Sequence, residues 1–413
     1  AGYPDPPAIA NGYNGISWPT MTIHGTEEMH FFAVGDWGSL DGSAQPQAGR
    51  PQLVQYAGGN LPGPHTFAHR PGSCKPDTEL ANCFMTRGLP PCNSACNYVD
   101  GIDNHAQTLV ANQMKARAAA SDPKLILNVG DNFYWGGIPQ DCGTSMNTMS
   151  GLTKKMFDDI FVGIYSGPGL DGKPWLSVLG NHDWGGRVFN NGWDQQIAYT
   201  WTSNRWVLPA PYWYVRVEYP DQDFSVDVFF TDSNFIDAQD PPEDPEHNLC
   251  GSKHNPPDAN CSLAGGPSSV ESCKDWFQEL WSQQQPWLER HLSESSATWQ
   301  VVVTHFPCGH EQEFYARLRG LGLDLLVTGH RHDQELWLPE DTAKNHMGGL
   351  TCIVTGGGGG ITSEATPDPS NTTDWYGEGQ YGFYDLTING SMIFVESINW
   401  NGTVLATSVV RPS

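Results

Sequence analysis

The sequence has few basic residues and no long apolar run. It carries 21 Lys and Arg against 46 Asp and Glu, which gives a formal net charge of -25. Nucleic acids and anionic membrane surfaces are bound largely through Lys and Arg, so this deficit argues against both kinds of partner. No stretch of about 18 apolar residues occurs, so the sequence predicts no insertion into a membrane.

The sequence also lacks internal repeats and a phosphate-binding loop of the P-loop type. The glycine run 356–360 resembles such a loop, but the Lys-Ser/Thr ending is missing. We interpret it as a tight turn after a buried strand. The chain begins at Ala1 without a basic and apolar leader, which is typical of a processed mature product.

Cysteine, glycine and proline, by contrast, are plentiful. Ten cysteines, 46 glycines and 31 prolines predict a loop-rich protein from an oxidising compartment. Four N-x-S/T sites predict N-linked glycans, at Asn260, Asn371, Asn389 and Asn401. Together these features favour a secreted or cell-surface protein, or one from an acidic endomembrane compartment. The pairing of the cysteines stays open, and Cys308 is interpreted as part of a disulfide rather than as a nucleophile.

The organisation along the chain suggests one domain with insertions. Residues 1–29 are rich in Pro, Gly and Asn and predict an N-terminal arm on the surface. Residues 30–413 predict a single domain, interrupted by Cys-containing excursions at about 40–102 and 235–273. Three roles stay open for these excursions, namely covering the site, binding a partner and stiffening the surface.

A strand, helix and strand can be predicted near the start of the domain. Residues 30–36 form an apolar run, 104–120 have helical apolar spacing, and 125–131 form a second apolar run. This order predicts a βαβ unit. Near the C-terminus, Asn389-Gly390 between two apolar runs predicts a hairpin turn.

Five strand-like segments end in residue types that bind metals. The endings, in chain order, are Asp36, Asp131 with Tyr134, Asn181 with His182, His305, and His330 with His332. Ligand sites of open α/β sheets lie outside the carboxyl ends of the strands, so these side chains are expected to meet. The glycines before Asp36, Asp131, Asn181 and His330 are expected to let the backbone turn sharply as it leaves the sheet. One such ending is usually a turn residue, whereas five in order favour a metal site.

The pattern GD, GDNFY, GNH, H and GH-x-H resembles the dinuclear metallophosphoesterases of the calcineurin-like superfamily. The tyrosine in GDNFY, with the stretches PWLSVLGNHD and QPWLERHL, is similar to the small, tartrate-resistant purple acid phosphatases. The resemblance covers about residues 30–400 apart from the excursions. It implies an α/β (α+β sandwich) fold with two packed mixed β-sheets flanked by helices in four layers.

By position, the resemblance implies a ligand set for two metals. Asp36, Asp131, Tyr134 and His332 would bind the first metal and Asn181, His305 and His330 the second, with Asp131 bridging both. Phenolate and carboxylate suit Fe(III), whereas imidazole and amide oxygen suit a divalent Fe, Zn or Mn. A tyrosinate on Fe(III) would also give the colour of the family. The implied reaction is hydrolysis of small phosphate monoesters by a metal-bound hydroxide in a secreted acid phosphatase.

Two further histidines are predicted to act in catalysis. His182 follows the ligand Asn181 and would protonate the leaving group or hold the phosphate; the alternative is that it only orients its neighbours. Along the sequence, His310 lies closer to His305 than the corresponding histidine does in the small purple acid phosphatases. It either takes over that role from a reshaped loop or the role is lost.

Three tryptophans, Trp37, Trp135 and Trp184, follow ligand motifs closely. We interpret them as packing residues of the ligand loops, and the alternative is an aromatic rim that stacks on aryl or nucleotide esters.

Other functions also stay open at this point. They are a phosphodiesterase or nucleotide pyrophosphatase on the same centre, an extracellular interaction glycoprotein on a phosphatase fold, and iron-based redox chemistry.

Overall fold

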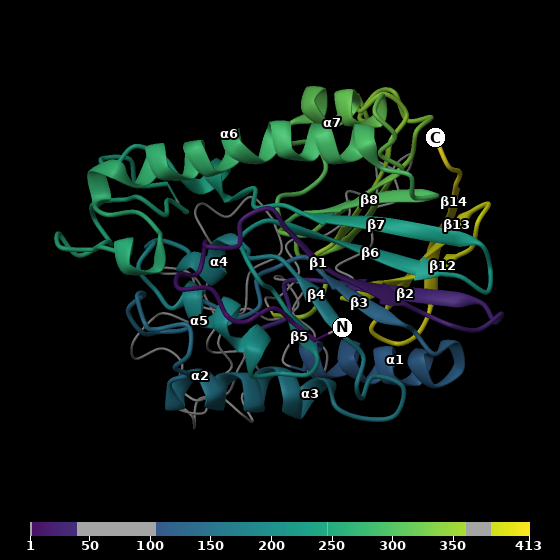
Figure 1. The fold of residues 1–413 in the computed structure, drawn as a ribbon, viewed down its shortest axis with the longest axis horizontal. Coiled ribbons are helices and arrows are strands. Elements are labelled where there is room, and N and C mark those ends of the chain that lie inside the picture. The colour runs from purple at the N-terminus through teal and green to yellow at the C-terminus, as the bar shows by residue number, and fades with distance from the viewer. Residues whose placement is uncertain (1, 39–104, 246, 361–380) are drawn as a thin grey trace, which may run out of the picture.

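The computed structural model describes residues 2–38, 105–245, 247–360 and 381–413 (Figure 1). The first predicted excursion and the glycosylation site at Asn371 lie outside the described residues. The second excursion is described almost throughout.

Two seven-stranded sheets form the centre of the fold. The first sheet has the order β1 (Ile16–Thr22), β6 (Trp213–Tyr219), β7 (Phe224–Phe230), β8 (Trp299–Val303), β9 (Leu325–Thr328), β11 (Thr351–Thr355) and β10 (Gln334–Trp337). The second has the order β14 (Val404–Val410), β13 (Ile393–Asn399), β12 (Gly382–Ile388), β2 (Met29–Val34), β3 (Leu125–Asn128), β4 (Trp175–Ser177) and β5 (Trp206–Val207). Both sheets mix parallel and antiparallel pairs.

Helices lie on the outer faces of the two sheets and also within the loops at the ends of the strands. They are α1 (Ala106–Ser121), α2 (Gly151–Met156), η3 (Phe157–Val162), α3 (Gly163–Tyr165), α4 (Asn181–Trp184), α5 (Trp193–Ala198), η4 (Tyr199–Trp201), η5 (Asn234–Asp237), η6 (Ser262–Ala264), α6 (Val270–Glu294) and α7 (Gln312–Arg319). In Figure 1, α6 and α7 run along the top, over β6, β7 and β8, and α1, α2 and α3 run along the bottom. The arrangement is the predicted sandwich of two mixed sheets between helices.

Alternation along β2 shows how the sequence builds these layers. Phe31 and Ala33 pack into the core between the two sheets, whereas Phe32 and Val34 pack into the core that includes α1. Successive side chains of a strand point to opposite faces, so an uninterrupted apolar run is what a strand buried on both faces requires. Since β2 pairs in parallel with β3 and α1 connects them, the predicted βαβ unit is confirmed.

The N-terminal arm contains a strand. Ile16–Thr22 forms β1, which pairs in parallel with β6 at the edge of the first sheet. The composition of residues 1–29 did not predict this strand, because its partner is almost two hundred residues away and Pro19 interrupts the apolar pattern. Edge strands tolerate proline, since one side of the strand needs no ladder partner.

Pro286 lies inside α6, and the helix continues through it without interruption. The helix continues through the proline because one face is buried on both sides of it. Trp281 packs on the first sheet before the proline, and Leu288 packs on it afterwards. Tertiary packing of this kind offsets the backbone hydrogen bond that proline removes.

Three disulfides lie among the described residues, and they are Cys142–Cys261, Cys250–Cys273 and Cys308–Cys352. The pairing of Cys308 confirms its interpretation as a disulfide cysteine rather than a nucleophile. None of the described helices combines the length and the apolar character needed to cross a lipid bilayer.

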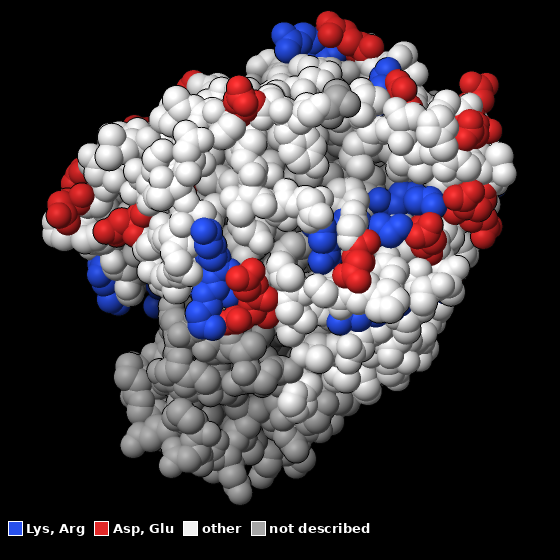
Figure 2. Space-filling model, turned by 60° about the horizontal axis from the view of Figure 1, so that its bottom comes forward, with Lys and Arg blue, Asp and Glu red and all other residues white. Residues whose placement is uncertain are grey.

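One face of the molecule shows how basic and acidic side chains are distributed on the surface. On the face in Figure 2, Lys and Arg stand beside Asp and Glu in small mixed groups. A nucleic-acid groove requires a stripe of basic residues, and this face has no such stripe.

Candidate metal centre

The seven predicted ligands meet where the carboxyl ends of five strands converge. Asp36, Asp131 and Asn181 follow β2, β3 and β4, which are parallel neighbours in the second sheet. His305 and His330 follow β8 and β9, which are parallel neighbours in the first sheet. The site therefore lies at the edge where both sheets end, as expected for ligand sites of α/β sheets.

The first group of predicted ligands consists of Asp36, Asp131, Tyr134 and His332, and Tyr134 lies at its centre. Its Oη lies 3.1 Å from Asp36 Oδ1, 2.8 Å from Asp131 Oδ2 and 3.1 Å from His332 Nε2. All four side chains are buried. A phenol has one O–H, so it can donate to only one of these three acceptors at a time. The remaining lone pairs face one another, and a cation placed among them would remove that repulsion.

The second group of predicted ligands consists of Asn181, His305 and His330. In this group, too, acceptor atoms face one another. His305 Nδ1 donates to the carbonyl oxygen of Val129 at 2.8 Å, so in the neutral ring the Nε2 lone pair faces inward. Asn181 Nδ2 donates to Asp237 Oδ2 at 2.8 Å, so Asn181 Oδ1 faces His305 Nε2 at 3.0 Å. Two acceptors therefore point at each other, which is stable only when a proton or a metal cation lies near them.

Asp131 belongs to both groups. One potential ligand atom from each of Asp131, His305 and His330 lies within 4.8 Å of the others, and the same holds for Asp36, Asp131 and His332. Asp131 Oδ2 lies 3.4 Å from His305 Nε2, while Oδ1 accepts the backbone N–H of His182 at 2.9 Å. A carboxylate shared in this way has the position of a bridging ligand between two cations.

The electrostatics fit a site that needs positive charge. Burial raises the pKa of Asp36 well above its usual range, and burial with the neighbouring Asp131 and Asp36 carboxylates does the same for the pKa of Tyr134. Burial alone would lower the pKa of His305, but Asp131 and Asp36 raise it to about 10. His305 thus retains a proton beside the acidic cluster, where a metal cation would displace it.

The other two predicted histidine ligands are neutral. Burial lowers the pKa of His330 well below its usual range and lowers the pKa of His332 to about 3. Neutral imidazole is the form that binds metals, because its second nitrogen has a free lone pair. Among the described residues, no Lys or Arg hydrogen-bonds to Asp36, Asp131 or Tyr134. The donors therefore fit two metal ions.

Strained backbone holds three of these residues in place. Asp36, Asp131 and His330 have φ of 56°, 51° and 69°, which L side chains seldom adopt. Such strain persists only where the surrounding structure enforces it, and it is frequent at functional sites. The tight turns are made by the polar residues themselves.

The glycines that precede the predicted ligands do not all form the sharp turns that the sequence predicted. We expected all of them to supply the sharp turn, but among them only Gly130 has positive φ. A Cβ on Gly180 would come within 2.1 Å of Asp131 Oδ1, and one on Gly329 within 2.6 Å of Asp36 Oδ2. These glycines let the ligand loops approach one another closely, which no local pattern could show.

A family comparison decides the class of the chain. The family model described as calcineurin-like phosphoesterase matches residues 29–334. The chain belongs to this family. The resemblance to the calcineurin-like metallophosphoesterases that was inferred from the sequence is therefore confirmed.

Curated relatives narrow the similarity to phosphatases. Over 265 residues the chain is 26% identical to tartrate-resistant acid phosphatase type 5 of Oryctolagus cuniculus, covering 62% of this chain and 67% of the relative. It is 27% identical over 315 residues to purple acid phosphatase 7 of Arabidopsis thaliana, covering 72% and 79%. The match to the type 5 phosphatase of Sus scrofa spans only 51% of that protein.

A solved structure shares the fold. GAP50, described as the anchor in the inner membrane complex of Plasmodium, aligns with a TM-score of 0.55 at 14% identity, covering 94% of this chain and 90% of the other. At this identity the likeness shows the fold alone.

A pocket of about 320 Å³ opens beside the phosphoesterase centre. Its lining is dominated by histidines and consists of His182, His247, Pro307, His310, His330, Arg331 and His332. Both histidines predicted for catalysis thus lie in this pocket. His182 Nδ1 donates to the carbonyl oxygen of Trp135 at 2.5 Å, which leaves Nε2 as the nitrogen available for another partner.

Sequence reasoning missed three residues of the phosphoesterase site. Asp183 is buried and accepts the backbone N–H groups of Asn132 and Gly180, both at 2.8 Å, so it ties two ligand loops together. Asp237 orients the Asn181 amide. His247 lines the pocket although its sequence context, PEHNLC, contains no metal or catalytic motif. Asp183 could have been noticed, since it completes the GNHD motif.

The three tryptophans near the ligand motifs divide into two kinds. Trp37 and Trp184 are fully buried, and they pack against aromatic side chains of the core, which matches the packing interpretation. Trp135 is only partly buried, and the centroid of its ring lies 4.6 Å from the centroid of the His182 ring. Trp135 therefore packs against two of the histidines that line the pocket, His182 and His247.

Proposed function

We propose that the protein is an acid phosphatase that hydrolyses small phosphate monoesters at a dinuclear metal centre. The observation that carries this proposal is the position of Asp131 in two overlapping groups of potential ligands. A turn or capping residue has no reason to be shared by two such groups. The phosphatase names of the curated relatives support the same reaction.

The chemistry of the donors supports Fe(III) with a divalent Fe, Zn or Mn. Asp36, Tyr134 and His332 would bind Fe(III), because phenolate and carboxylate oxygens are hard anionic donors. Asn181, His305 and His330 would bind the divalent ion, and Asp131 would bridge the two. When bound, the two cations would neutralise the phosphoryl group and lower the pKa of a coordinated water.

The protein's own side chains would position the substrate and transfer protons. His182 is held by its Nδ1 hydrogen bond to Trp135, and its backbone N–H is fixed to Asp131. Its Nε2 would donate a proton to the leaving alkoxide, which is the role of a general acid. His310 and Arg331 line the same pocket and would attract the phosphoryl oxygens. Glu311 and Glu313 would repel an anion, but they are exposed and do not line the pocket.

The interaction-glycoprotein alternative predicts a degraded ligand set. All seven positions carry competent donors, and six of them are buried. Their completeness therefore supports hydrolysis. Secretion and N-glycosylation stay predictions, and the exposed Asn260 and Asn401 are accessible to glycan transfer.

Steady-state rates on paired aryl esters test the proposal. We expect the metal-loaded protein to cleave an aryl phosphate monoester with a kcat/KM at least about tenfold above that for the matching diester. This ratio follows because the pocket places histidines and Arg331 against a dianionic phosphoryl group. A preference for the diester would support the phosphodiesterase alternative. If neither ester is cleaved, the proposed hydrolysis is refuted.

A further inference from the structure

The second excursion contributes side chains to the phosphoesterase site. Asp237, in η5 at its start, accepts the hydrogen bond that orients Asn181. Ten residues later, His247 lines the catalytic pocket. The excursion therefore does more than cover the fold or stiffen its surface.

The His247 ring is packed among the residues of the site. It stacks on Trp135, with centroids 5.5 Å apart and an interplanar angle of 26°. It meets His182 edge-on at 5.0 Å and His330 at 6.5 Å. These contacts place His247 against both the proposed general acid and a proposed metal ligand.

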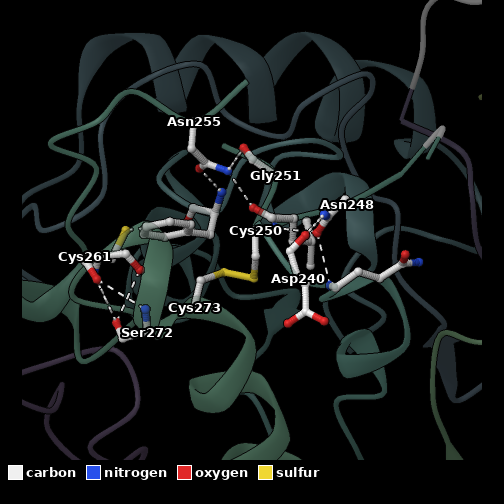
Figure 3. Close-up of a disulfide and its surroundings, with 12 residues drawn as sticks. Asp240, Asn248, Cys250, Gly251, Asn255, Cys261, Ser272 and Cys273 are labelled. Atoms are coloured by element: carbon white, nitrogen blue, oxygen red, sulfur yellow. Dashed lines mark hydrogen bonds between the residues drawn. A yellow bond between two sulfur atoms is a disulfide. The ribbon is translucent and has the colours of Figure 1, made fainter. Parts of the chain in front are cut away.

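The chain after His247 is rigidly anchored (Figure 3). Asn248 is buried; its Nδ2 donates to the carbonyl oxygens of Asp240 and Glu243 at 3.1 and 3.0 Å, and its Oδ1 accepts the N–H of Cys250 at 2.9 Å. The Cys250–Cys273 disulfide then ties the segment to the first turn of α6. A side chain on such a support keeps its position without substrate, as a binding residue requires.

The surroundings of the two ring nitrogens indicate which one faces the substrate. His247 Nδ1 is out of contact with solvent and has no hydrogen-bond partner among the described residues. A buried lone pair without a partner is better tolerated than a buried N–H without one. The proton of the neutral ring is therefore placed on Nε2, which can donate a hydrogen bond into the pocket.

We propose that His247 binds the substrate, donating a hydrogen bond from Nε2 to a phosphoryl oxygen of the ester. The inference rests on the proposed phosphatase function and adds a residue supplied by the disulfide-tied excursion, outside the strand-end motifs. Because the phosphoryl group is common to all phosphate monoesters, the contact would strengthen binding of every ester and of inorganic phosphate.

Substitution of His247 tests the proposal by two separate measurements. For His247→Ala we expect kcat/KM to fall about 10- to 100-fold, equally for aryl and alkyl phosphates, since hydrogen bonds to charged groups have this strength. We expect the dissociation constant of inorganic phosphate, measured by calorimetry on the metal-loaded protein, to rise by a similar factor. Metal content and thermal stability should stay at the wild-type level.

Two conservative variants identify the nitrogen involved. The amide nitrogen of Gln lies near the position of histidine Nε2, and that of Asn lies near Nδ1. His247→Gln should recover part of the phosphate affinity, and His247→Asn should not. The matched control is His254→Ala, in the same excursion, since His254 pairs with Asp244 and does not line the pocket. This control should behave as wild type.

Several outcomes would overturn the inference. They are unchanged phosphate affinity in His247→Ala, a loss of activity confined to alkyl esters, recovery by Asn instead of Gln, and loss of metal from the variant. If the wild-type protein cleaves no phosphate ester, the proposed function fails. Phosphate binding by wild type and His247→Ala still tests this contact separately.

Discussion

Asp131→Ala is expected to remove both metals and to lower kcat at least about a thousandfold. The loss is large because the change removes the one carboxylate that both ligand groups share. Dinuclear centres supply several kcal/mol of transition-state stabilisation, and each 1.36 kcal/mol corresponds to about tenfold in rate. Metal analysis of the purified variant and its steady-state rate on an aryl phosphate are the measurements.

Two isosteric variants distinguish the loss of a metal ligand from a general disturbance of the fold. Asp131→Asn preserves the size of the side chain but removes its charge, and it should also lose metal. Asp194→Asn is the control, because Asp194 is a buried aspartate that accepts the backbone N–H groups of Gly143 and Thr144 and belongs to neither ligand group. It should retain two metals and full activity. Two metals and wild-type turnover in Asp131→Asn would refute the bridging role.

His182→Ala is expected to retain both metals and to lose about 10²- to 10⁴-fold in kcat, the usual contribution of a general acid. Since His182 lines the pocket and its Nδ1 is engaged by Trp135, the loss should come from Nε2. The deficit should be larger for alkyl phosphates than for aryl phosphates, because the alkoxide is the poorer leaving group. Rates on the two esters, with metal content, test this.

His182→Asn is the matched variant for this prediction. The Asn amide can still donate to the Trp135 carbonyl, but nothing replaces Nε2. It should therefore be as slow as His182→Ala on alkyl esters. Metal loss in both variants would instead make His182 a residue that orients the neighbouring ligands.

The convergence of the predicted ligands could be foreseen because the five segments that carry them each follow an apolar run. A strand ending needs only local pattern, and parallel neighbours bring such endings together. The roles of Gly180 and Gly329 were misjudged, since the close approach they permit is between loops far apart in sequence. Local pattern determines where a strand ends, but not which loops will touch.

His247 and Asp237 were beyond sequence reasoning for a related reason. They come from an excursion without periodicity or motif, and its path depends on a disulfide whose pairing was open. The strand β1 was missed because its partner strand, β6, is distant in the chain. Each case depends on long-range contacts rather than on the residues nearby.

The most direct test of the dinuclear centre is a visible spectrum of the purified protein, with metal analysis of the same sample. We predict two metals per chain, one of them iron, and a purple-to-pink band that shifts on mild reduction and disappears in Tyr134→Phe. This band would arise from tyrosinate on Fe(III), and Tyr134 lies against Asp36, Asp131 and His332. A colourless protein that holds two zinc or manganese ions would contradict the Fe(III) assignment. A protein that binds no metal, even after metal is added back, would contradict the dinuclear centre itself.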